Sequence, residues 1–500
     1  MHTEITDVLI VGGGVNGAGI ARDAAGRGLS VTLVEQGDLA SATSSASTKL
    51  FHGGLRYLEQ YDFLLVRKAL KERQILLRMM PHIAHPMRFV LPHVKGMRPA
   101  WMLRVGLFIY DHLDLGQTLP KTRMLRLRSD VAGQALKPHL TRAFEYSDGW
   151  VDDARLVVLN ARDAADRGAR ILTRTRLEHA RRDGAEWLAD LHQTDTGNRV
   201  RIRARALINA GGPWVNRVID TLEGVVPPDP VRLVRGSHIV VKKLFDHDRA
   251  YFFQLPDGRI IFAIPYQGEF TLIGTTDVDH QGDPSVAVCS KEEAEYLCRA
   301  ASDYFARPVV PADIIWTYAG VRPLDDTLEG SASKASRDYH IKVSDKDGTA
   351  PLISIYGGKI TTYRKLAEQA VAELAPYVEL SGLPWTDHAP LPGGDFAAAD
   401  RAAVIAALSA DHPYLDATTC ARLIAAYGTL AGKMLGEATS MADLGRDFGA
   451  GLTACEVNWL RRREWAVTAQ DILWRRSKLG LRVIPEQAAE LDIWLKENPL

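Results

Sequence analysis

The first residues that could do chemistry are three glycines near the N-terminus, Gly12, Gly14 and Gly17. Their G-x-G-x-x-G spacing allows a tight turn, a close approach of the backbone to a pyrophosphate at a helix N-terminus, and close packing of that helix on a strand. Glu35 follows where a carboxylate can accept a hydrogen bond from a ribose hydroxyl, and an acid there disfavours a 2′-phosphate. The pattern favours an adenine dinucleotide, NAD or FAD, over a simple glycine-rich turn.

A dense cluster of hydroxyl side chains, residues 41–50, comes soon afterwards, and residues 51–57 add the sequence FHGGLRY. Small hydroxyl residues and glycines fit a loop that wraps phosphates or a flat ring. A solvated serine-rich loop is the alternative interpretation. The position of the cluster directly after the dinucleotide unit argues against that alternative.

Three cationic residues, Arg56, Arg322 and Lys359, stand beside glycines or at predicted strand ends. An arginine suits bidentate binding of a phosphate or carboxylate, and a lysine adds a compact charge. Taken one at a time, each is more simply a surface or ion-pair residue. The sequence alone does not bring the three together.

Two histidines are candidates for a catalytic role. His238 lies inside an apolar strand, where a structural histidine is the simpler interpretation, but a neutral histidine facing a substrate hydroxyl is a reasonable general base near pH 7. His52 is equally ambiguous, although its flanking glycines indicate close approach of a ligand. The chain contains no H-E-x-x-H, Cys/His cluster or G-x-S-x-G pattern. We therefore predict neither a metal nor a serine nucleophile.

A βαβ unit must position the first glycines. Residues 7–11 form an apolar, β-branched run that predicts a buried strand, residues 15–27 predict a helix, and residues 30–35 predict a second strand. Further elements predict one doubly wound α/β sheet assembled from separated segments, namely a helix at 152–167 and strands at 170–175, 206–210 and 352–356.

The remaining sequence predicts two more domains. Strands at 237–241, 259–265 and 270–275 predict an antiparallel sheet. After the last strand of the first sheet, glycines at 357 and 358 lead into a helix at about 361–374. Residues 377–395, rich in proline and glycine, are predicted to be a linker, and residues 396–500 have helical periodicity.

Composition limits the class of protein. The 500 residues correspond to about three domains, and 46% hydrophobic and 24% charged residues are ordinary for a globular chain. Equal numbers of basic and acidic residues, 61 each, argue against a dedicated nucleic-acid binder. Four scattered cysteines predict free thiols in a reducing compartment. We expect neither a secretory signal nor a membrane-spanning helix.

Residues 97–128 interleave basic with aromatic and aliphatic side chains. This combination suits an anionic membrane surface. A helix packed on the core with its arginines in solvent is the alternative, and from the residues alone it is the simpler one.

Taken together, the motifs resemble one family over essentially the whole chain, the FAD-dependent, quinone-linked (aerobic) glycerol-3-phosphate dehydrogenases. The resemblance is far more specific than the glycine pattern alone, and the chain shows no gross departure from it. The motifs that carry the resemblance are DVLIVGGGVNGAG at 7–19, ATSSASTK at 42–49, HGGLRY at 52–57, WVDDAR at 150–155, GSHIVV at 236–241, GTTD at 274–277, GVRP at 320–323 and GGKITTYRK at 357–365.

The resemblance implies a Rossmann-like FAD-binding domain of the D-amino-acid-oxidase type, an antiparallel-sheet substrate domain and a C-terminal all-helical domain. The implied division is an FAD-binding domain at 1–90, 151–235 and 346–376, a substrate or membrane-associated segment at 91–150, a substrate domain at 236–345, a linker at 377–395 and the helical domain at 396–500. Non-covalent FAD is implied, with oxidation of sn-glycerol 3-phosphate to dihydroxyacetone phosphate and transfer of electrons to ubiquinone. The family also implies peripheral or monotopic attachment to the cytoplasmic face of the inner membrane, through residues 97–128, and a homodimer.

Roles for single residues also follow from the resemblance. Arg56, Arg322 and Lys359, with Tyr57 assisting, are expected to bind the substrate phosphate. Arg322 is expected to polarise the C2 oxygen, and His238 to act as the base. The residues expected to bind FAD are Gly12, Gly14, Gly17, Glu35, Thr43, Ser44, Lys49, His52, Gly53, Gly54, Ala210, Gly211, Gly358 and Thr361.

Other activities share most of these motifs. An oxidase would pass the electrons to oxygen, and an amine, amino-acid or 2-hydroxy-acid oxidase of the same fold would recognise a carboxylate. An NAD-dependent dehydrogenase would lack a bound flavin, and a non-catalytic FAD-binding protein would hold flavin that no polyol phosphate reduces.

Overall fold

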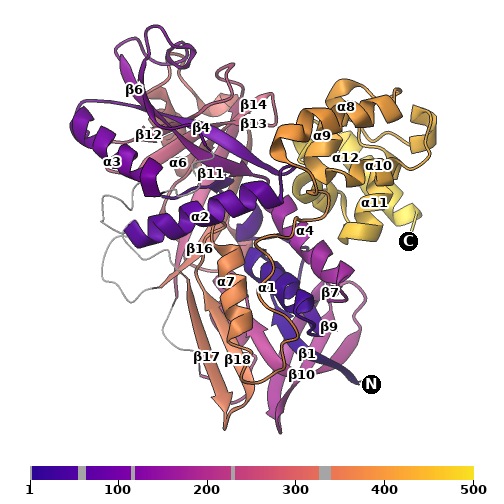
Figure 1. Cartoon of the computed structure of the whole chain (residues 1–500). Coiled ribbons are helices and arrows are strands. Elements are labelled where there is room, and N and C mark those ends of the chain that lie inside the picture. The colour runs from indigo at the N-terminus through magenta and orange to yellow at the C-terminus, as the bar shows by residue number, and fades with distance from the viewer. Residues whose placement is uncertain (1–2, 55–62, 114–118, 227–230, 326–338, 500) are drawn as a thin grey trace.

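The computed structural model describes residues 3–54, 63–113, 119–226, 231–325 and 339–499 (Figure 1). Within these residues the chain forms two large sheets and a separate helical domain near the C-terminus. The helical domain lies beside α4 (Asp153–Asp166), as Figure 1 shows in yellow and orange.

The first sheet is the predicted doubly wound α/β sheet. Its described strands run in the order β17, β18, β10, β1, β2, β7, and the last five of these pair in parallel. Their bounds are β1 (Thr3–Val11), β2 (Val31–Val34), β7 (Arg170–Leu172), β10 (Arg199–Asn209), β17 (His340–Lys346) and β18 (Thr349–Tyr356), with the antiparallel pair β8 (Thr175–Asp183) and β9 (Glu186–Gln193) beside β10.

Helices α1 (Val15–Gly26), α4 and α7 (Tyr363–Ala372) pack on this sheet through small apolar side chains. A Cβ atom built at Gly19 would lie 2.8 Å from the Tyr363 ring, so α1 and α7 are in close contact. The βαβ unit is confirmed. Helix α7 begins two residues later than predicted, because a turn at 360–362 precedes it.

The second sheet is largely antiparallel, as predicted, except that β4 and β12 pair in parallel. Its described strands are β3 (Leu50–Phe51), β4 (Ala84–Pro92), β5 (Arg123–Arg126), β6 (Arg142–Val151), β11 (Val231–Lys242), β12 (Ala250–Gln254), β13 (Ile260–Tyr266), β14 (Phe270–Gly274), β15 (Val278–Asp279) and β16 (Ile314–Asp325). Helices α2 (Phe63–Met79), α3 (Ala100–Leu113) and α6 (Lys291–Ser302) contribute side chains to its hydrophobic cores, and a short helix, α5 (Val215–Ile219), follows β10.

Besides the two-residue strand β3, which joins the second sheet from segment 1–90, two strands lie in a different sheet from the one that the expected boundaries give them. β4 pairs with β6 and β12 in the second sheet, although most of it falls within the expected FAD-binding segment 1–90. β17 pairs with β18 in the first sheet, although it falls almost wholly within the expected substrate domain 236–345. Both departures arise because sequence patterns give strands but not their partners.

The C-terminal domain is all helical, as predicted, and has its own hydrophobic core. Its helices are α8 (Arg401–Asp411), α9 (Ala417–Tyr427), α10 (Leu430–Leu435), α11 (Ala454–Glu464) and α12 (Pro485–Glu497). Residues 377–395, which the structure describes completely, form no helix or strand. They nevertheless pack against α1, since Trp385 Nε1 donates to the Asp23 carbonyl and Arg22 donates to the Ala389 carbonyl.

Candidate active site

The turn between β1 and α1 has the geometry of a phosphate-binding turn. Gly12 has a φ of +115°, and a Cβ atom there would lie 2.5 Å from the Ala210 carbonyl oxygen. A Cβ atom at Gly17 would lie 1.9 Å from the Gly12 carbonyl oxygen. Both positions therefore require glycine. Gly14 caps α1 without a side chain, so backbone and helix N-terminus stand open to an anion.

Glu35 lies at the end of β2, where a dinucleotide ribose would be held. Its carboxylate accepts hydrogen bonds from the amides of Gly13, at 2.7 Å, and Gly37, at 2.8 Å. Burial raises the pKa of Glu35, while these two amide donors oppose the shift. An ionised carboxylate has about four acceptor positions, so two remain for hydroxyl groups.

Residues 43–54, the hub segment, bring the separated parts of the site together. Ser44 Oγ accepts from the Val15 amide at 2.9 Å, at the start of α1, and Thr43 Oγ1 donates to the Val321 carbonyl on β16 at 2.5 Å. Thr48 Oγ1 lies 3.0 Å from His238 Nε2 on β11. The hub segment therefore joins the glycine turn to the second sheet.

The end of the hub segment reaches two more elements. The His52 amide donates to Thr361 Oγ1 at 3.3 Å, which joins it to the turn before α7. The Gly53 amide donates to the Tyr110 hydroxyl on α3 at 2.9 Å, and Gly54 has a φ of +76°. Arg56 and Tyr57, the next predicted site residues, lie outside the described residues.

Lys49, which is also expected to bind FAD, holds the hub segment through its side chain. Its ammonium group is fully buried and donates to the Ser45 carbonyl, at 3.1 Å, and to both carboxylate oxygens of Asp153, at 2.8 Å. These bonds use the three ammonium hydrogens. The ammonium group therefore fixes the hub segment itself.

His238 faces the hub segment from β11. Its ring stacks on Tyr318 of β16, with centroids 4.7 Å apart and planes at 13°. On the neighbouring strand, a Cβ atom at Gly274 would lie 2.1 Å from the imidazole, so only glycine leaves room for the ring. Burial, then the positive charges of Arg322 and Lys49, lower the pKa of His238 well below its usual value. The ring is neutral near pH 7, and its Nδ1 atom has no hydrogen-bond partner among the described residues.

Arg322 lies farther along the same face of the sheet. Pairing places His238 opposite Tyr318, Gly236 opposite Gly320, and Val234 opposite Arg322. Two glycines thus lie between the histidine and the arginine, and a Cβ atom at Gly236 would lie 2.3 Å from Arg322 Nη2. This glycine strip, Gly236 and Gly320, lets Arg322 and Ala46 of the hub segment pack close to the backbone between the imidazole and the guanidinium.

The guanidinium of Arg322 is held by Asp277 and Thr275. It forms an ion pair with the Asp277 carboxylate, and Nη2 donates to Thr275 Oγ1 at 3.1 Å. A quarter of the side chain remains exposed. An oriented guanidinium of this kind can bind an anion with little loss of its own freedom.

The remaining predicted residues lie at the ends of β10 and β18. The Ala210 amide donates to Val11, and Gly211 follows with its amide bonded to Asn209 Oδ1, so both adjoin the glycine turn. Gly358 has a φ of +101° and packs near Asn16 of α1. Lys359 is half-buried in the same turn. The described contacts do not place Lys359 beside Arg322.

Sequence reasoning missed four residues that hold this site. They are Thr48, Asp153, Asp277 and Tyr318. Each lies within or directly beside a motif already singled out, in ATSSASTK, WVDDAR, GTTD and before GVRP. The signal that could have found them was therefore the motif as a whole and not its charged or glycine positions alone.

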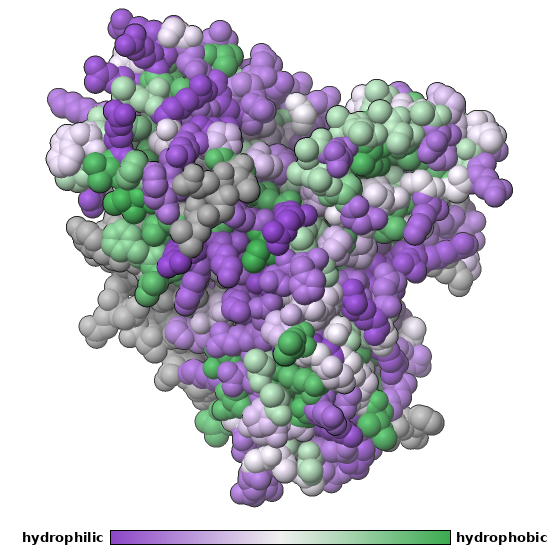
Figure 2. Space-filling model, viewed as in Figure 1, coloured by the Kyte–Doolittle hydropathy of each residue, from purple (hydrophilic) through white to green (hydrophobic). Residues whose placement is uncertain are grey.

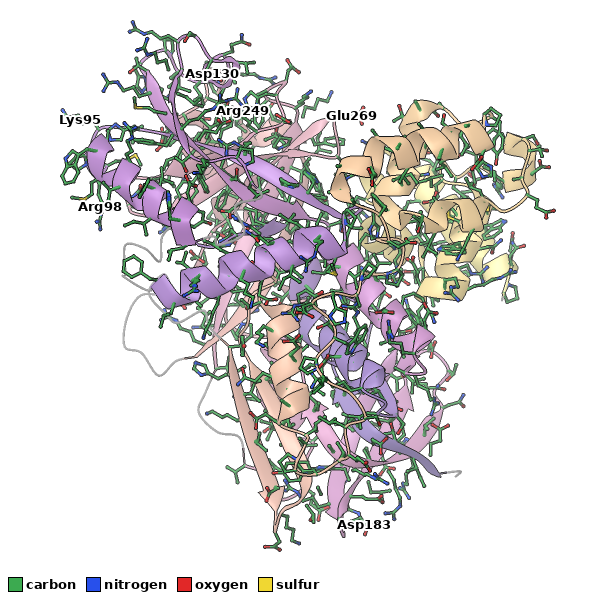
Figure 3. The ribbon with its side chains drawn as sticks, in the orientation of Figure 1. Lys95, Arg98, Asp130, Asp183, Arg249 and Glu269 are labelled. Carbon is green, nitrogen blue, oxygen red and sulfur yellow. The ribbon has the colours of Figure 1, made fainter. Side chains whose placement is uncertain are left out.

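Helix α3, from the basic and aromatic segment 97–128, exposes apolar side chains. Trp101 is 65% exposed, Val105 50% and Phe108 60%, at a spacing that puts them on one helical face. Figure 2 shows hydrophobic residues gathered on the left of the view, over this part of the molecule. Lys95 and Arg98 lie at the same end (Figure 3), and Arg104 is also exposed. Helix α3 also packs on the core through Leu107 and Tyr110, so it combines a core-packed face with an exposed face that is apolar as well as basic.

Comparison with known proteins identifies the family. The model of the FAD dependent oxidoreductases matches residues 7–364, and the C-terminal domain of alpha-glycerophosphate oxidase matches residues 384–492. This chain belongs to the FAD-dependent oxidoreductases. The expected D-amino-acid-oxidase type of fold and the family resemblance are confirmed.

Close relatives cover the whole chain. A glycerol-3-phosphate dehydrogenase of Pseudomonas aeruginosa is 50% identical over 99% of this chain and 96% of its own. An aerobic glycerol-3-phosphate dehydrogenase of Escherichia coli is 47% identical over 99% and 98%. A D-erythritol 1-phosphate dehydrogenase of Brucella abortus is 46% identical over 98% of both chains. Among solved structures, a glycerol-3-phosphate dehydrogenase of Bacillus halodurans complexed with FAD has a TM-score of 0.76 at 27% identity, over 98% of this chain and 94% of the other.

The site fits the FAD of this family. The glycine turn is a cradle that a Cβ atom would fill at Gly12 or Gly17, and Glu35 stands at the position of the ribose. No helix within the described residues is long and apolar enough to cross a membrane.

Proposed function

We propose that this protein oxidises sn-glycerol 3-phosphate to dihydroxyacetone phosphate, with FAD as hydride acceptor and ubiquinone as the final acceptor. The names of the most similar relatives support the substrate. The single observation that carries the proposal in the structure is the strip between His238 and Arg322. A neutral base and an oriented guanidinium lie on this one face of the sheet, and the oxidation of a phosphorylated secondary alcohol needs both groups.

Bound FAD supplies a two-electron acceptor for the hydride of the substrate C2–H bond. The residues of the chain do the rest. The turn at Gly12, Gly14 and Gly17 binds the pyrophosphate, and Glu35 binds a ribose hydroxyl. The other proposed FAD ligands are Thr43, Ser44, Lys49, His52, Gly53, Gly54, Ala210, Gly211, Gly358 and Thr361.

The substrate is proposed to bind beside the glycine strip, against Arg322. Arg322 binds the phosphate and polarises the C2 oxygen, and Arg56, Tyr57 and Lys359 complete the phosphate site. His238 takes the hydroxyl proton on Nδ1, which is the nitrogen without a partner. Positioning of the alcohol between these groups is the main contribution of the protein to the rate.

A spectrum of the purified protein under argon tests the substrate directly. We expect sn-glycerol 3-phosphate to bleach the oxidised-flavin bands, while glycerol bleaches them at least about a hundredfold more slowly, because a charge-assisted phosphate contact contributes about 1.5–3 kcal/mol and several are lost. The enantiomer sn-glycerol 1-phosphate keeps the phosphate and should also react more slowly, because its C2–H bond is then wrongly oriented. A flavin that stays oxidised would refute the substrate. A colourless protein that does not take up FAD would refute the site.

D-Erythritol 1-phosphate is a second candidate substrate, because one relative of nearly equal identity bears that name. It is a longer polyol phosphate with the same two reacting features, a secondary alcohol and a phosphate. The same bleaching experiment, run with both compounds at equal concentration, decides between them by the ratio of second-order rate constants.

The acceptor is tested separately. Reduced protein is mixed with a water-soluble ubiquinone analogue or with oxygen, and the rate of flavin reoxidation and the yield of peroxide are measured. Rapid reoxidation by the quinone with little peroxide supports a dehydrogenase. Fast reaction with oxygen and stoichiometric peroxide would identify an oxidase instead.

We further propose that the protein binds peripherally to an anionic membrane through α3 and its basic flank, on the cytoplasmic face of the inner membrane, as a homodimer. The exposed row Trp101, Val105 and Phe108 supports membrane contact, because such side chains insert at the boundary between headgroups and acyl chains.

A further inference from the structure

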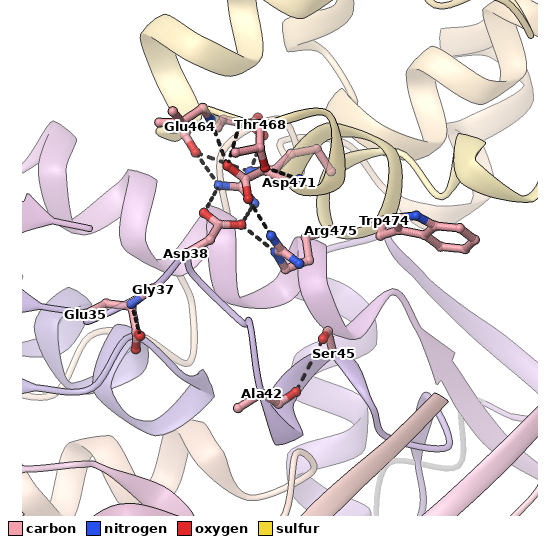
Figure 4. Close-up of polar contacts among 12 residues, drawn as sticks. Glu35, Gly37, Asp38, Ala42, Ser45, Glu464, Thr468, Asp471, Trp474 and Arg475 are labelled. Carbon is pink, nitrogen blue, oxygen red and sulfur yellow. Dashed lines mark hydrogen bonds and ion pairs between the residues drawn. The ribbon is translucent and has the colours of Figure 1, made fainter. Parts of the chain in front are cut away.

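The C-terminal domain sends one segment, residues 471–478, toward the cofactor side of the site. This segment begins with the π-helical turn η9 (Asp471–Arg476). Arg476 is almost fully buried, and its two terminal nitrogens donate to the Asp38 carboxylate at 2.8 Å. Arg475 Nε donates to the same carboxylate at 2.6 Å. Figure 4 shows these bonds, with Asp38 on the chain just beyond Glu35.

Trp474, from the same segment, touches the other side of the site. Its ring stacks on Trp316 of β16, with centroids 4.3 Å apart and planes at 23°. Trp316 packs against Tyr318 at 4.9 Å, and Tyr318 stacks on His238 at 4.7 Å. Because alternate residues of a strand point to one face, Trp316 and Tyr318 are neighbours on β16. The four rings form a continuous row, the aromatic row, from the C-terminal domain to His238.

Trp474 is itself held in place. The buried ammonium group of Lys478 donates to the Trp474 carbonyl at 2.7 Å. A Cβ atom at Gly480 would lie 2.4 Å from the indole, so that position leaves room only for glycine. The next two residues, Arg475 and Arg476, donate hydrogen bonds to Asp38. The backbone that carries the indole is therefore held in place.

We propose that Trp474 is a positioning residue for the reaction, which acts on His238 through Trp316 and Tyr318. Only the kinetic consequence of this role, slower reduction of the flavin by the substrate, rests on the proposed function. The imidazole is fixed on one side by Gly274 and on the other by the Tyr318 ring, and the Tyr318 ring has the two indoles behind it. Loss of the Trp474 ring leaves space into which Trp316 and Tyr318 can move, and His238 then loses its fixed position.

The test compares W474A with W474F and with a control, W459A. Trp459 is a partly buried tryptophan that packs on the core of the same domain and is not one of the four rings of the aromatic row. We expect W474A to slow anaerobic flavin reduction by sn-glycerol 3-phosphate about tenfold or more, since a displacement of about 1 Å can lower a rate a hundredfold. The substrate concentration for half-maximal rate should change less than about twofold, because the aromatic row does not include Arg322. W474F should recover most of the rate, and W459A should keep it.

A crystal structure of W474A, with FAD bound, tests the same role without the substrate. We expect the Tyr318 ring to shift toward the vacated space, with a larger separation between its centroid and that of His238. An unchanged stack, or a wild-type rate in W474A, overturns the proposal whatever the substrate is. If the wild-type flavin is not reduced by sn-glycerol 3-phosphate, the proposed function fails, and the displaced stack alone then decides the positioning role. An equal slowing in W459A would mean that any damage to the domain has this effect, and would also overturn it.

Discussion

The Nε2 atom of His238 lies 3.0 Å from the Oγ1 atom of Thr48, and the Nδ1 atom has no hydrogen-bond partner among the described residues. A neutral imidazole carries one proton, and the bond made by one nitrogen sets the state of the other. When Thr48 accepts the proton of Nε2, Nδ1 keeps its lone pair, as a general base must. A threonine hydroxyl can also donate to Nε2, and we propose that Thr48 accepts here, because the other tautomer would bury an Nδ1–H group without an acceptor.

Replacing Thr48 by valine removes this acceptor with little change in volume. We expect the rate of flavin reduction by sn-glycerol 3-phosphate to fall about tenfold or more, as for a base that is wrongly protonated part of the time, with little change in KM. Stopped-flow absorbance under argon measures the rate. Thr48→Ser, which keeps a hydroxyl group, is the control and should retain most of it. A valine variant as fast as the wild type would remove Thr48 from the mechanism.

Arg322 offers a prediction about substrate recognition. Arg322→Gln removes the charge beside Asp277, and we expect kcat/KM for the phosphorylated substrate to fall by about 10- to 100-fold, the range for a charge-assisted hydrogen bond of about 1.5–3 kcal/mol. The rate with unphosphorylated glycerol measures any effect that does not involve the phosphate. Equal losses with both compounds would show that Arg322 acts on the C2 oxygen or on the fold and not on the phosphate.

The glycine turn illustrates what the sequence could predict. A strand, three glycines at fixed spacing and a helix are contiguous, and local sterics require glycine at Gly12 and Gly17, so the βαβ unit and its ligand class follow from adjacent residues. The helical C-terminal domain was predictable for the same reason, because helical periodicity is local.

The partners of the site residues were not predictable in this way. Lys49 meets Asp153, and His238 meets Thr48 and Tyr318, each from a distant part of the chain. These contacts depend on strand register and on which sheet a strand joins, and neither property is encoded in the local pattern. The expected domain boundaries separate β17 and β4 from the strands with which they pair for the same reason. The resemblance named residues that are expected to face ligands, but not the residues that hold them in place.

The buried pair Lys49–Asp153 supports a prediction about stability. Both side chains are fully buried, so Lys49→Met leaves a carboxylate without its partner cation. We expect this change to lower the free energy of unfolding by about 3–5 kcal/mol and to reduce the FAD content, because the hub segment loses its anchor. The double variant K49M/D153N removes the uncompensated charge and should recover part of the loss. Thermal melting and the flavin absorbance ratio measure both effects, and a single variant as stable as the wild type would contradict the argument.

His82 predicts a pH dependence of stability. Burial, with the nearby charges of Arg155 and Arg401, lowers its pKa to about 3. In the unfolded chain the pKa is about 6.5, so below that pH the unfolded state binds a proton that the folded state does not. The stability that comes from keeping His82 neutral is fully present above pH 6.5. As the pH falls from 6.5 toward 3, the free energy of unfolding decreases by about 1.4 kcal/mol per pH unit.

The variant His82→Gln isolates that contribution, because glutamine does not titrate. Between pH 6.5 and 5 we expect the melting temperature of the wild type to fall more steeply than that of the variant, whatever their difference at neutral pH. His388→Gln, at an exposed histidine, is the control and should follow the wild type. Parallel curves for the wild type and His82→Gln would mean that His82 is not buried in its neutral form.

The exposed face of α3 gives the test of membrane contact. Trp101 and Phe108 are 65% and 60% exposed, and burying each in the lipid interface contributes about 1–2 kcal/mol from its apolar area. The double variant W101S/F108S should therefore bind vesicles containing phosphatidylglycerol about tenfold or more weakly than the wild type in a sedimentation assay. Its flavin reduction by soluble substrate should be unchanged, because both side chains point away from the protein.

The control is V286S, which removes an apolar side chain that is 70% exposed outside α3. Raising the salt concentration should weaken wild-type binding, since Lys95, Arg98 and Arg104 lie on the same flank and their attraction to anionic lipid is screened. Equal binding by all three proteins would show that α3 does not face the membrane.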